Sequence, residues 1–236
     1  MPYEDFDLDS LAKYLHITPQ QVMKLADRGK LPGRKVAGQW VFSQHEIHHW
    51  LEDRIGASDE IELVEVEGVL DRAAPSDAEE ISITEMLPFE AIAVPLEAKT
   101  RSRVISSICE LAVQTGLLWD ATKMEEAVRD REELHPTALD NGVALLHPRR
   151  PLPAILAEPF LALGRTYKGI PFGGGRGNLT DIFFLICSTD DRSHLRILAR
   201  LSRVLTDTEL LDSIRTAQDA LAVRTAIESA EARLNA

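Results

Sequence analysis

The sequence has few cysteines, no long apolar run and no excess of positive charge. Its 236 residues include only two cysteines, Cys109 and Cys187, which lie inside apolar runs without the spacing of a disulfide framework or a metal site. Buried free thiols, and with them a reducing cytoplasm, are therefore expected. No segment approaches the roughly 18 uninterrupted apolar residues of a membrane helix, and the acidic N-terminus lacks the apolar core of a signal peptide. We therefore expect no membrane insertion.

The formal net charge of −12 argues against a protein that coats nucleic acid, yet the charge is distributed unevenly. Residues 1–56 hold seven basic and eight acidic residues, residues 57–80 hold one and nine, and residues 81–236 hold eighteen and twenty-one. The acidic excess in the middle stretch predicts two domains, 1–56 and 81–236, joined by an acidic linker over 57–80. Within that linker, residues 61–70 alternate apolar and acidic side chains, as a strand does.

Two short helices are predicted near the N-terminus, separated by a turn of a few residues. The first has Asp9 as a candidate N-cap and an apolar face, and the second begins with Thr18 as N-cap. Pro19 then occupies the first helical position, where its missing N–H costs nothing. Gly29 suits the left-handed residue that follows a helix end. Together these signals indicate a helix-turn-helix.

A hairpin and a third helix follow. Two short strand-like pieces flank Ala37-Gly38, a pair typical of a tight hairpin turn. The stretch "SQHE" from Ser43 to Glu46 is a capping-box pattern that opens a helix. The whole segment "LAKYLHITPQQVMKLADRGKLPGRKVAGQWVFSQHEIHHWL" resembles the excisionase/MerR-type winged helix-turn-helix domain.

In that family the second helix enters the major groove and the wing contacts the backbone or minor groove. The resemblance therefore implies DNA contacts from seven residues: Gln20, Gln21, Lys24 and Arg28 on the helix, and Arg34, Lys35 and Gln39 on the hairpin. The near-zero net charge of residues 1–56 also allows a second interpretation, a module for protein contact. If it binds DNA, one such domain has few base contacts, so we expect a homodimer or a partner.

Three histidines, His45, His48 and His49, share a face of the third predicted helix. Helical spacing of histidines can signal a metal site, but no HExxH pattern is present and no cysteine lies nearby. A solvated helix face is the better interpretation. We expect neither a metal nor another cofactor.

Strands and helices alternate from residue 81 onward. The strand-like segments are 91–97, 142–147, 154–159 and 179–188, and the helical segments are 99–118, 120–134, 191–205, 207–217 and 219–234. Thr100 and Asp120 are the candidate N-caps of the first two helices. The pattern predicts an α/β fold with a mixed β-sheet flanked by helices.

The segment "DREELHPTALDNGVALLHP" (130–148) combines an Arg-Glu pair, a Thr, a Gly-containing turn and an apolar strand that ends in a His. It resembles the active-site segment of enzyme IIA domains of the fructose/mannitol/nitrogen-regulatory type in the phosphoenolpyruvate phosphotransferase system. The later segment "LTDIFFLICSTDDRSHLRILARLSRVL" matches that family's second landmark, a strand, a loop and a helix with a His in its first turn. The resemblance spans about 81–230.

The resemblance implies a role for each matching residue: His147 as phosphoacceptor, Arg131 as the cation for the phosphoryl oxygens, His194 as the partner imidazole and Thr137 as a hydroxyl donor. A neutral imidazole is a competent nucleophile near neutral pH, and a bidentate guanidinium suits phosphoryl oxygens. Arg149 and Arg150 would add positive potential. The sequence departs from the family pattern at Leu146, where the family has Pro, and in "LDNG", which is less glycine-rich than usual.

A glycine cluster, "IPFGGGRGNLT" (170–180), precedes the last predicted strand. It lacks the Gly-Lys-Ser/Thr ending of a nucleotide-binding loop, and no helix follows it. A flexible loop near the active-site surface is therefore expected rather than a nucleotide site.

Three functions are compatible with these segments. The first is a cytoplasmic regulator that accepts a phosphoryl group on His147 from an HPr-type phosphocarrier and binds DNA or a regulatory partner through residues 1–56. The second is a sugar-transport IIA component that passes phosphate to an enzyme IIB, and the third is a degenerate IIA fold that only binds. In the first, a phosphoryl group adds about −1.5 to −2 charges, which would alter domain docking or DNA affinity.

Overall fold

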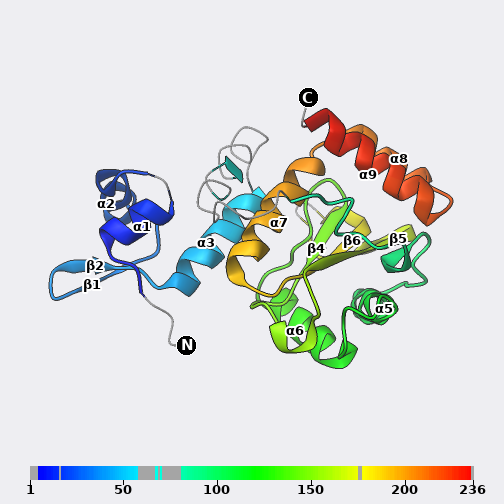
Figure 1. The fold of residues 1–236 in the computed structure, drawn as a ribbon, viewed down its shortest axis with the longest axis horizontal. Coiled ribbons are helices and arrows are strands. Elements are labelled where there is room, and N and C mark those ends of the chain that lie inside the picture. Colours follow the sequence, from blue (N-terminus) through cyan, green and yellow to red (C-terminus); the bar gives the residue numbers. More distant parts are fainter. Residues whose placement is uncertain are drawn as a thin grey trace. The chain divides into compact units, whose positions relative to one another are not determined.

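The structure is a computed structural model of the chain, and it describes residues 5–15, 17–57, 67–68, 70, 81–174 and 177–234. The chain divides into two compact units, Met1–Glu80 and Ile81–Ala236, called the N-terminal and C-terminal units below. Figure 1 shows their elements in sequence colours. Within the described residues, no helix combines the length and apolar character that a membrane crossing requires.

The N-terminal unit begins with α1 (Leu8–Tyr14) and α2 (Pro19–Asp27). The N-cap of α1 is Asp7, not Asp9 as expected, because the Asp7 carboxylate accepts the Ser10 N–H while the Ser10 hydroxyl accepts the Asp7 N–H. Asp9 lies in the first turn, where its negative charge still suits the helix dipole.

The expected signals around α2 are confirmed. Thr18 is the N-cap and forms a reciprocal capping box with Gln21, and Pro19 is the first helical residue. Gly29 follows the helix end with φ of +66°, and the Lys30 N–H donates to the Leu25 carbonyl, which closes the C-terminus.

A two-stranded antiparallel hairpin forms the wing, with β1 (Arg34–Val36) paired to β2 (Gln39–Val41). The turn residues Ala37 and Gly38 both have positive φ, 50° and 84°, as a type I′ hairpin turn requires. Helix α3 (Gln44–Ala57) follows, and the Ile47 N–H donates to the Ser43 carbonyl at its start.

Most of the stretch expected to be a linker, 57–80, lies outside the described residues. Ala57 is the last residue of α3. Of the expected strand over 61–70, only residues 67, 68 and 70 are described, and their backbone is helical. The expectation of a strand is therefore wrong for these three residues.

The C-terminal unit contains a short 3-10 helix η1 (Phe89–Ala91), strands β3 (Ile92–Ala93), β4 (Val143–Leu146), β5 (Phe160–Pro171) and β6 (Leu179–Cys187), helices α5 (Arg101–Val113), α6 (Ala121–Leu134), α7 (Asp191–Val204), α8 (Thr208–Thr216) and α9 (Ala220–Leu234), and the 3-10 helix η2 (Pro153–Ile155). Thr100 and Asp120 cap α5 and α6 as expected, because each side chain accepts a backbone N–H of the first turn.

The four strands form one mixed sheet in the order β3-β5-β6-β4. β5 and β6 are antiparallel, whereas β4 runs parallel to β6 with Leu146 opposite Leu185, and β3 runs parallel to β5. The mixed sheet flanked by helices confirms the predicted α/β class.

Both faces of the sheet are buried. On one face, alternate residues such as Ala144, Phe183 and Leu185 share a core cluster with side chains of α5 and α6. The intervening residues, including Leu145 and Phe184, point to the opposite face and are also buried. Helices α7 and α8 pack on β6, and α9 packs on α7 and α8 (Figure 1).

Two strand predictions fail here. The expected strand over 154–159 is wrong, since residues 153–155 form η2 and Leu156 makes an isolated bridge to Leu118. Pro159, the last residue of the expected strand, cannot donate a ladder hydrogen bond. The expected strand over 91–97 shrinks to Ile92–Ala93, although the Leu96 N–H still donates to the Arg165 carbonyl.

Strand β5 was not predicted, because Gly164 interrupts its pattern. A Cβ added to Gly164 would lie 2.6 Å from Leu96, so close packing explains this glycine.

Both cysteines are buried in the core of the C-terminal unit. Burial, with a smaller contribution from Glu125, raises the pKa of Cys109 to about 12. Burial also raises the pKa of Cys187 well above its ordinary value. We therefore expect almost no reaction of the native protein with a disulfide-type thiol reagent within minutes at pH 8. After unfolding in guanidinium both thiols should react, and only one in Cys109→Ser. A fast native reaction would show that a thiol is accessible.

Asp207 joins α8 to α9, since its carboxylate caps α8 through the Glu209 and Leu210 N–H groups and pairs with Arg233. Partial burial acts to raise the pKa of Asp207, but Arg233 and the cap bonds outweigh it and the pKa falls below its ordinary value. Asp207→Ala should lower the free energy of unfolding by about 1 kcal/mol at pH 7.

Asp207→Asn keeps a capping oxygen but loses the charge, so it isolates the ionic part. A lowered folded-state pKa stabilises the fold above the unfolded value of about 3.9 and loses that effect as the pH falls through the folded value. Urea unfolding should therefore show a parent–Asn difference at pH 7 that shrinks toward pH 2.5. A difference of constant size would contradict the ionic contribution.

Candidate functional site

Two parallel strands bring the predicted histidines together. Because β4 and β6 are neighbours and parallel, their carboxyl ends lie at the same edge of the sheet. His147 directly follows β4, and Ser188 directly follows β6 in the loop that leads to α7. In open α/β sheets this edge is where ligands bind.

Helix α7 places His194 in its first turn. Asp190 is the N-cap, accepts the Ser193 N–H with its side chain and accepts the His194 N–H with its carbonyl. The His194 ring lies with Nδ1 3.0 Å from the Ser188 hydroxyl. Its centroid is 5.0 Å from that of the His147 ring, with 53° between the planes, and both imidazoles are buried.

The tautomer of His147 follows from its main-chain contact. Nδ1 lies 2.8 Å from the Leu145 carbonyl oxygen, which can only accept a hydrogen bond. Nδ1 therefore carries the proton, and in the neutral ring Nε2 carries the lone pair. Nε2 is the nucleophilic atom of this arrangement.

Arg131 lies in the last turn of α6 and is buried. Its Nη1 donates to the His135 carbonyl at 2.8 Å, which fixes the guanidinium beside the segment that leads to β4. Thr137 lies on that segment, and its carbonyl accepts the Leu145 N–H at 3.3 Å. Its hydroxyl donates to the Glu132 carboxylate, so the hydroxyl proton is directed to Glu132.

Arg149 and Arg150 follow the acceptor segment and are exposed. They line an open hollow together with Ala127, Asp130, Glu133, Leu134, Pro148 and Leu152. Acidic and basic side chains both border this hollow, so its charge is mixed rather than purely positive.

The glycine-rich stretch packs against the segment before β4. A Cβ on Gly173 would lie 2.5 Å from Pro136, and its φ of +94° favours glycine. Asn178 donates to the Asp140 carbonyl at 3.0 Å. Gly175 and Arg176 lie outside the described residues.

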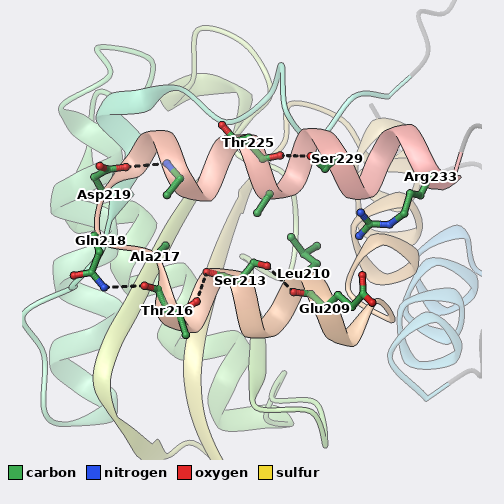
Figure 2. A pocket seen from close by; sticks show the side chains of 12 residues that line it. Glu209, Leu210, Ser213, Thr216, Ala217, Gln218, Asp219, Thr225, Ser229 and Arg233 are labelled. Carbon is green, nitrogen blue, oxygen red and sulfur yellow. Dashed lines mark hydrogen bonds between the residues drawn. The ribbon is translucent and has the colours of Figure 1, made fainter.

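A second hollow lies between α8 and α9 and is lined by mostly small side chains (Figure 2). Ser213, Thr216 and Ser229 donate their hydroxyls to carbonyls of their own helices. Because these protons are used within the helices, the hollow offers weaker hydrogen-bonding chemistry than the histidine pair.

In the N-terminal unit, the seven residues expected to contact DNA are all exposed. Lys35 lies 3.6 Å from Asp27, which brings the wing beside the end of α2, and Arg34 pairs with Asp5 at 2.7 Å. The Gln21 side-chain oxygen is taken by the Thr18 N–H and hydroxyl. Gln20, Lys24, Arg28 and Gln39 complete the candidate face.

Two histidines of α3 contact neighbouring side chains in this unit. Nε2 of His48 lies 2.9 Å from the Tyr14 hydroxyl, and Nδ1 of His49 lies 3.3 Å from Glu52. His48 is buried rather than solvated, which corrects the expectation of a solvated face at that position. The side chain of His45 lies outside the described residues.

Comparison with known proteins decides the family. The family model described as "Phosphoenolpyruvate-dependent sugar phosphotransferase system, EIIA 2" matches residues 85–230. The chain belongs to this EIIA family. A helix-turn-helix domain model matches residues 6–55, so the EIIA domain follows a helix-turn-helix domain.

Several proteins are similar to the EIIA domain. The nitrogen regulatory protein of Bradyrhizobium diazoefficiens is 28% identical over 144 residues, which cover 60% of this chain and 91% of that protein. The fructose-specific EIIABC component of Bacillus subtilis is 28% identical over 140 residues, which cover 58% of this chain but only 22% of that protein. The crystal structure of nitrogen regulatory protein IIA-Ntr from Neisseria meningitidis matches with a TM-score of 0.55 and 22% identity, covering 61% of this chain and 98% of that one.

Three residues that contact the candidate site residues were not predicted from the sequence: Glu132, Ser188 and Arg101. Glu132 had a signal, because it is the second half of the Arg-Glu pair in the segment 130–148. No sequence signal pointed to Ser188 or Arg101. Ser188 contacts His194 across a loop, and Arg101 contacts Glu132, which is distant in sequence.

Proposed function

We propose that the EIIA domain accepts a phosphoryl group on Nε2 of His147 from an HPr-type phosphocarrier, in a regulatory protein whose helix-turn-helix domain binds DNA. The observation that supports it most is the His147 ring itself. Its Nδ1–H is held by the Leu145 carbonyl, and its centroid lies 5.0 Å from the His194 ring. A ring fixed in this tautomer presents Nε2 as a nucleophile.

In the proposed transfer, the Nε2 lone pair attacks the phosphorus of a phosphohistidine on the donor. The donor's P–N bond breaks, its electron pair returns to the donor imidazole, and the Nδ1 proton of His147 stays in place. Positioning and charge stabilisation carry such a transfer. Because both imidazoles are buried, the donor must first gain access to Nε2, and a measured rate includes that step.

Arg131 and His194 are the proposed partners of the phosphoryl oxygens. The guanidinium supplies a permanent positive charge, and His194 lies in the first turn of α7, where the helix dipole favours an anion. Thr137 is assigned to the site, where its carbonyl accepts the Leu145 N–H of β4 and its hydroxyl donates to the Glu132 carboxylate. Phosphate on His147 would therefore be bound by Arg131 and His194, while Thr137 holds the neighbouring segment.

The first prediction of the proposed function concerns covalent phosphorylation. Incubation of the full chain with phosphoenolpyruvate, enzyme I and HPr should add one acid-labile phosphoryl group by intact mass. His147→Ala should add none, and Arg131→Ala should react at least about 100-fold more slowly, because a preorganised charge on the transferring group is worth several kcal/mol.

His135→Ala is the matched histidine control, since His135 is exposed and lies on the segment before β4. It should be phosphorylated like the parent. Absence of added mass on the parent with HPr and with nitrogen-branch donors would favour a binding protein without transfer. Rapid onward transfer to an enzyme IIB would instead favour a transport component.

For the helix-turn-helix domain we propose DNA contact through Gln20, Lys24 and Arg28 of α2 and the wing residues Arg34, Lys35 and Gln39. The exposed ion pairs of Arg34 and Lys35 contribute little in water, so both cations can exchange their carboxylates for phosphates. The amide of Gln21 is the least available, because its oxygen serves the capping box.

The second prediction is a mobility shift that weakens as salt rises. Lys24→Ala/Arg28→Ala should abolish it, because both cations lie on the exposed side or end of α2. Lys13→Ala/Lys123→Ala removes the same total charge from exposed positions outside α2 and the wing and should keep most of the shift. Equal losses in both variants would indicate a nonspecific charge effect, and no shift for the parent would favour a protein-contact module.

The third prediction couples the two domains. Phosphorylation of His147 should change the affinity for DNA, because the phosphoryl group adds about −1.5 to −2 charges to a chain that is already acidic. Fluorescence anisotropy with phosphorylated and unphosphorylated protein, and with His147→Ala mixed with the same donors, measures the change. Equal affinity of the two forms would exclude the coupling.

A further inference from the structure

Glu132 is a buried carboxylate at the centre of a set of hydrogen bonds on the segment before β4. One oxygen accepts both the N–H of Thr137, at 3.1 Å, and its hydroxyl. The other accepts Nη2 of Arg101 at 2.9 Å, and the same nitrogen donates to the Glu132 carbonyl at 2.6 Å. The side chain of Glu132 is 1% exposed, so these donors replace its water.

The segment that Glu132 holds is the outer partner of β4. β4 is the edge strand of the described sheet, and residues 137–139 run antiparallel along its outer side. The Leu145 N–H donates to the Thr137 carbonyl, and the Leu139 N–H donates to the Val143 carbonyl at 2.7 Å. An otherwise open strand edge is thereby closed.

The outer side of β4 is also the side that holds His147. The N–H and C=O of one residue point to the same edge of a strand. At Leu145 the N–H is bound by Thr137 and the C=O is bound by Nδ1 of His147. Thr137 therefore holds the backbone of Leu145 on its N–H side, and the carbonyl of the same residue fixes the His147 ring.

Arg101 and the glycine loop support this set from the other side. The Arg101 guanidinium lies 5.2 Å from the ring centroid of Phe172, and Gly173 packs against Pro136 without room for a Cβ. The start of α5, the end of α6 and the loop after β5 thus meet around Glu132 and residues 136–137.

From these contacts we infer that Glu132, held by Arg101, is a positioning residue that fixes the tautomer and direction of the His147 ring. It does so through Thr137 and the backbone of Leu145, whose N–H is bound by Thr137 and whose carbonyl is bound by the His147 ring, without touching the phosphoryl group. The inference rests on the proposed function for its kinetic consequence, whereas its structural consequence is independent of it. A buried carboxylate carries a desolvation cost, which a purely structural link between two segments would avoid with apolar side chains.

The test replaces the carboxylate by its nearly isosteric amide in the full chain. Glu132→Gln cannot accept at both oxygens, so either Thr137 or Arg101 loses its partner. We expect the rate of His147 phosphorylation at saturating phospho-HPr to fall about 10- to 100-fold, with the donor KM changed less than about twofold. In two-bond ¹H–¹⁵N spectra the parent should show His147 protonated on Nδ1, and the variant should show a mixture of tautomers.

Two further variants keep the test decisive if Glu132→Gln unfolds. Arg101→Ala removes the partly exposed cation and leaves the carboxylate in place, and it should shift the His147 spectrum in the same direction by a smaller amount. Arg103→Ala is the matched control, because Arg103 lies on the same helix and pairs with exposed Glu110. It should leave both the rate and the spectrum unchanged.

The outcomes separate the two proposals. A folded Glu132→Gln protein with the parent's spectrum and phosphorylation rate would overturn the positioning role. A shifted spectrum with no phosphorylation of the parent by any donor would support the positioning role and overturn the proposed function. A loss of thermal stability in Glu132→Gln without any change in the spectrum would assign Glu132 a structural role only.

Discussion

The parallel pairing of β4 with β6 is the constraint on which the candidate site depends. It sets Leu146 opposite Leu185, so the residues that follow the two strands emerge at one edge of the sheet. His147 comes from one strand and the Ser188–His194 loop and helix come from the other. Two imidazoles 47 positions apart then meet with their centroids 5.0 Å apart. No local interaction within either segment would produce this geometry.

The second requirement is that a strand at a sheet edge must satisfy its outer backbone groups. Residues 137–139 do this for β4, and the ring of His147 takes the last outer carbonyl, that of Leu145. The hydrogen bonds that complete this edge of the sheet therefore include the one that selects the tautomer of His147. Glu132 lies at the origin of this set, because its buried carboxylate accepts the hydrogen bonds of both Arg101 and Thr137.

Local signals in the sequence predicted the elements well, and contacts between distant segments account for what was missed. Thr18, Thr100 and Asp120 were identifiable as helix caps because a cap acts within four residues. The pairing of His147 with His194 came from a family resemblance. Strand β5 was not predicted, because Gly164 breaks its pattern and the reason for that glycine is close packing against Leu96, 68 residues earlier. The role of Arg101 was not predicted for the same reason, since its partner Glu132 lies on another helix.

Leu146 shows how one departure from the family pattern fits this fold. A proline before the acceptor would restrict the backbone but would contribute no N–H to the sheet. Leu146 is instead a regular member of β4 in register with Leu185, and its side chain is buried in the core cluster beside α5 and α6. The restraint on the acceptor then comes from the ring's own bond to Leu145 and from the segment that Glu132 holds. On this reasoning, Leu146 makes the hydrogen bonds around Thr137 more important in this chain than they would be behind a proline.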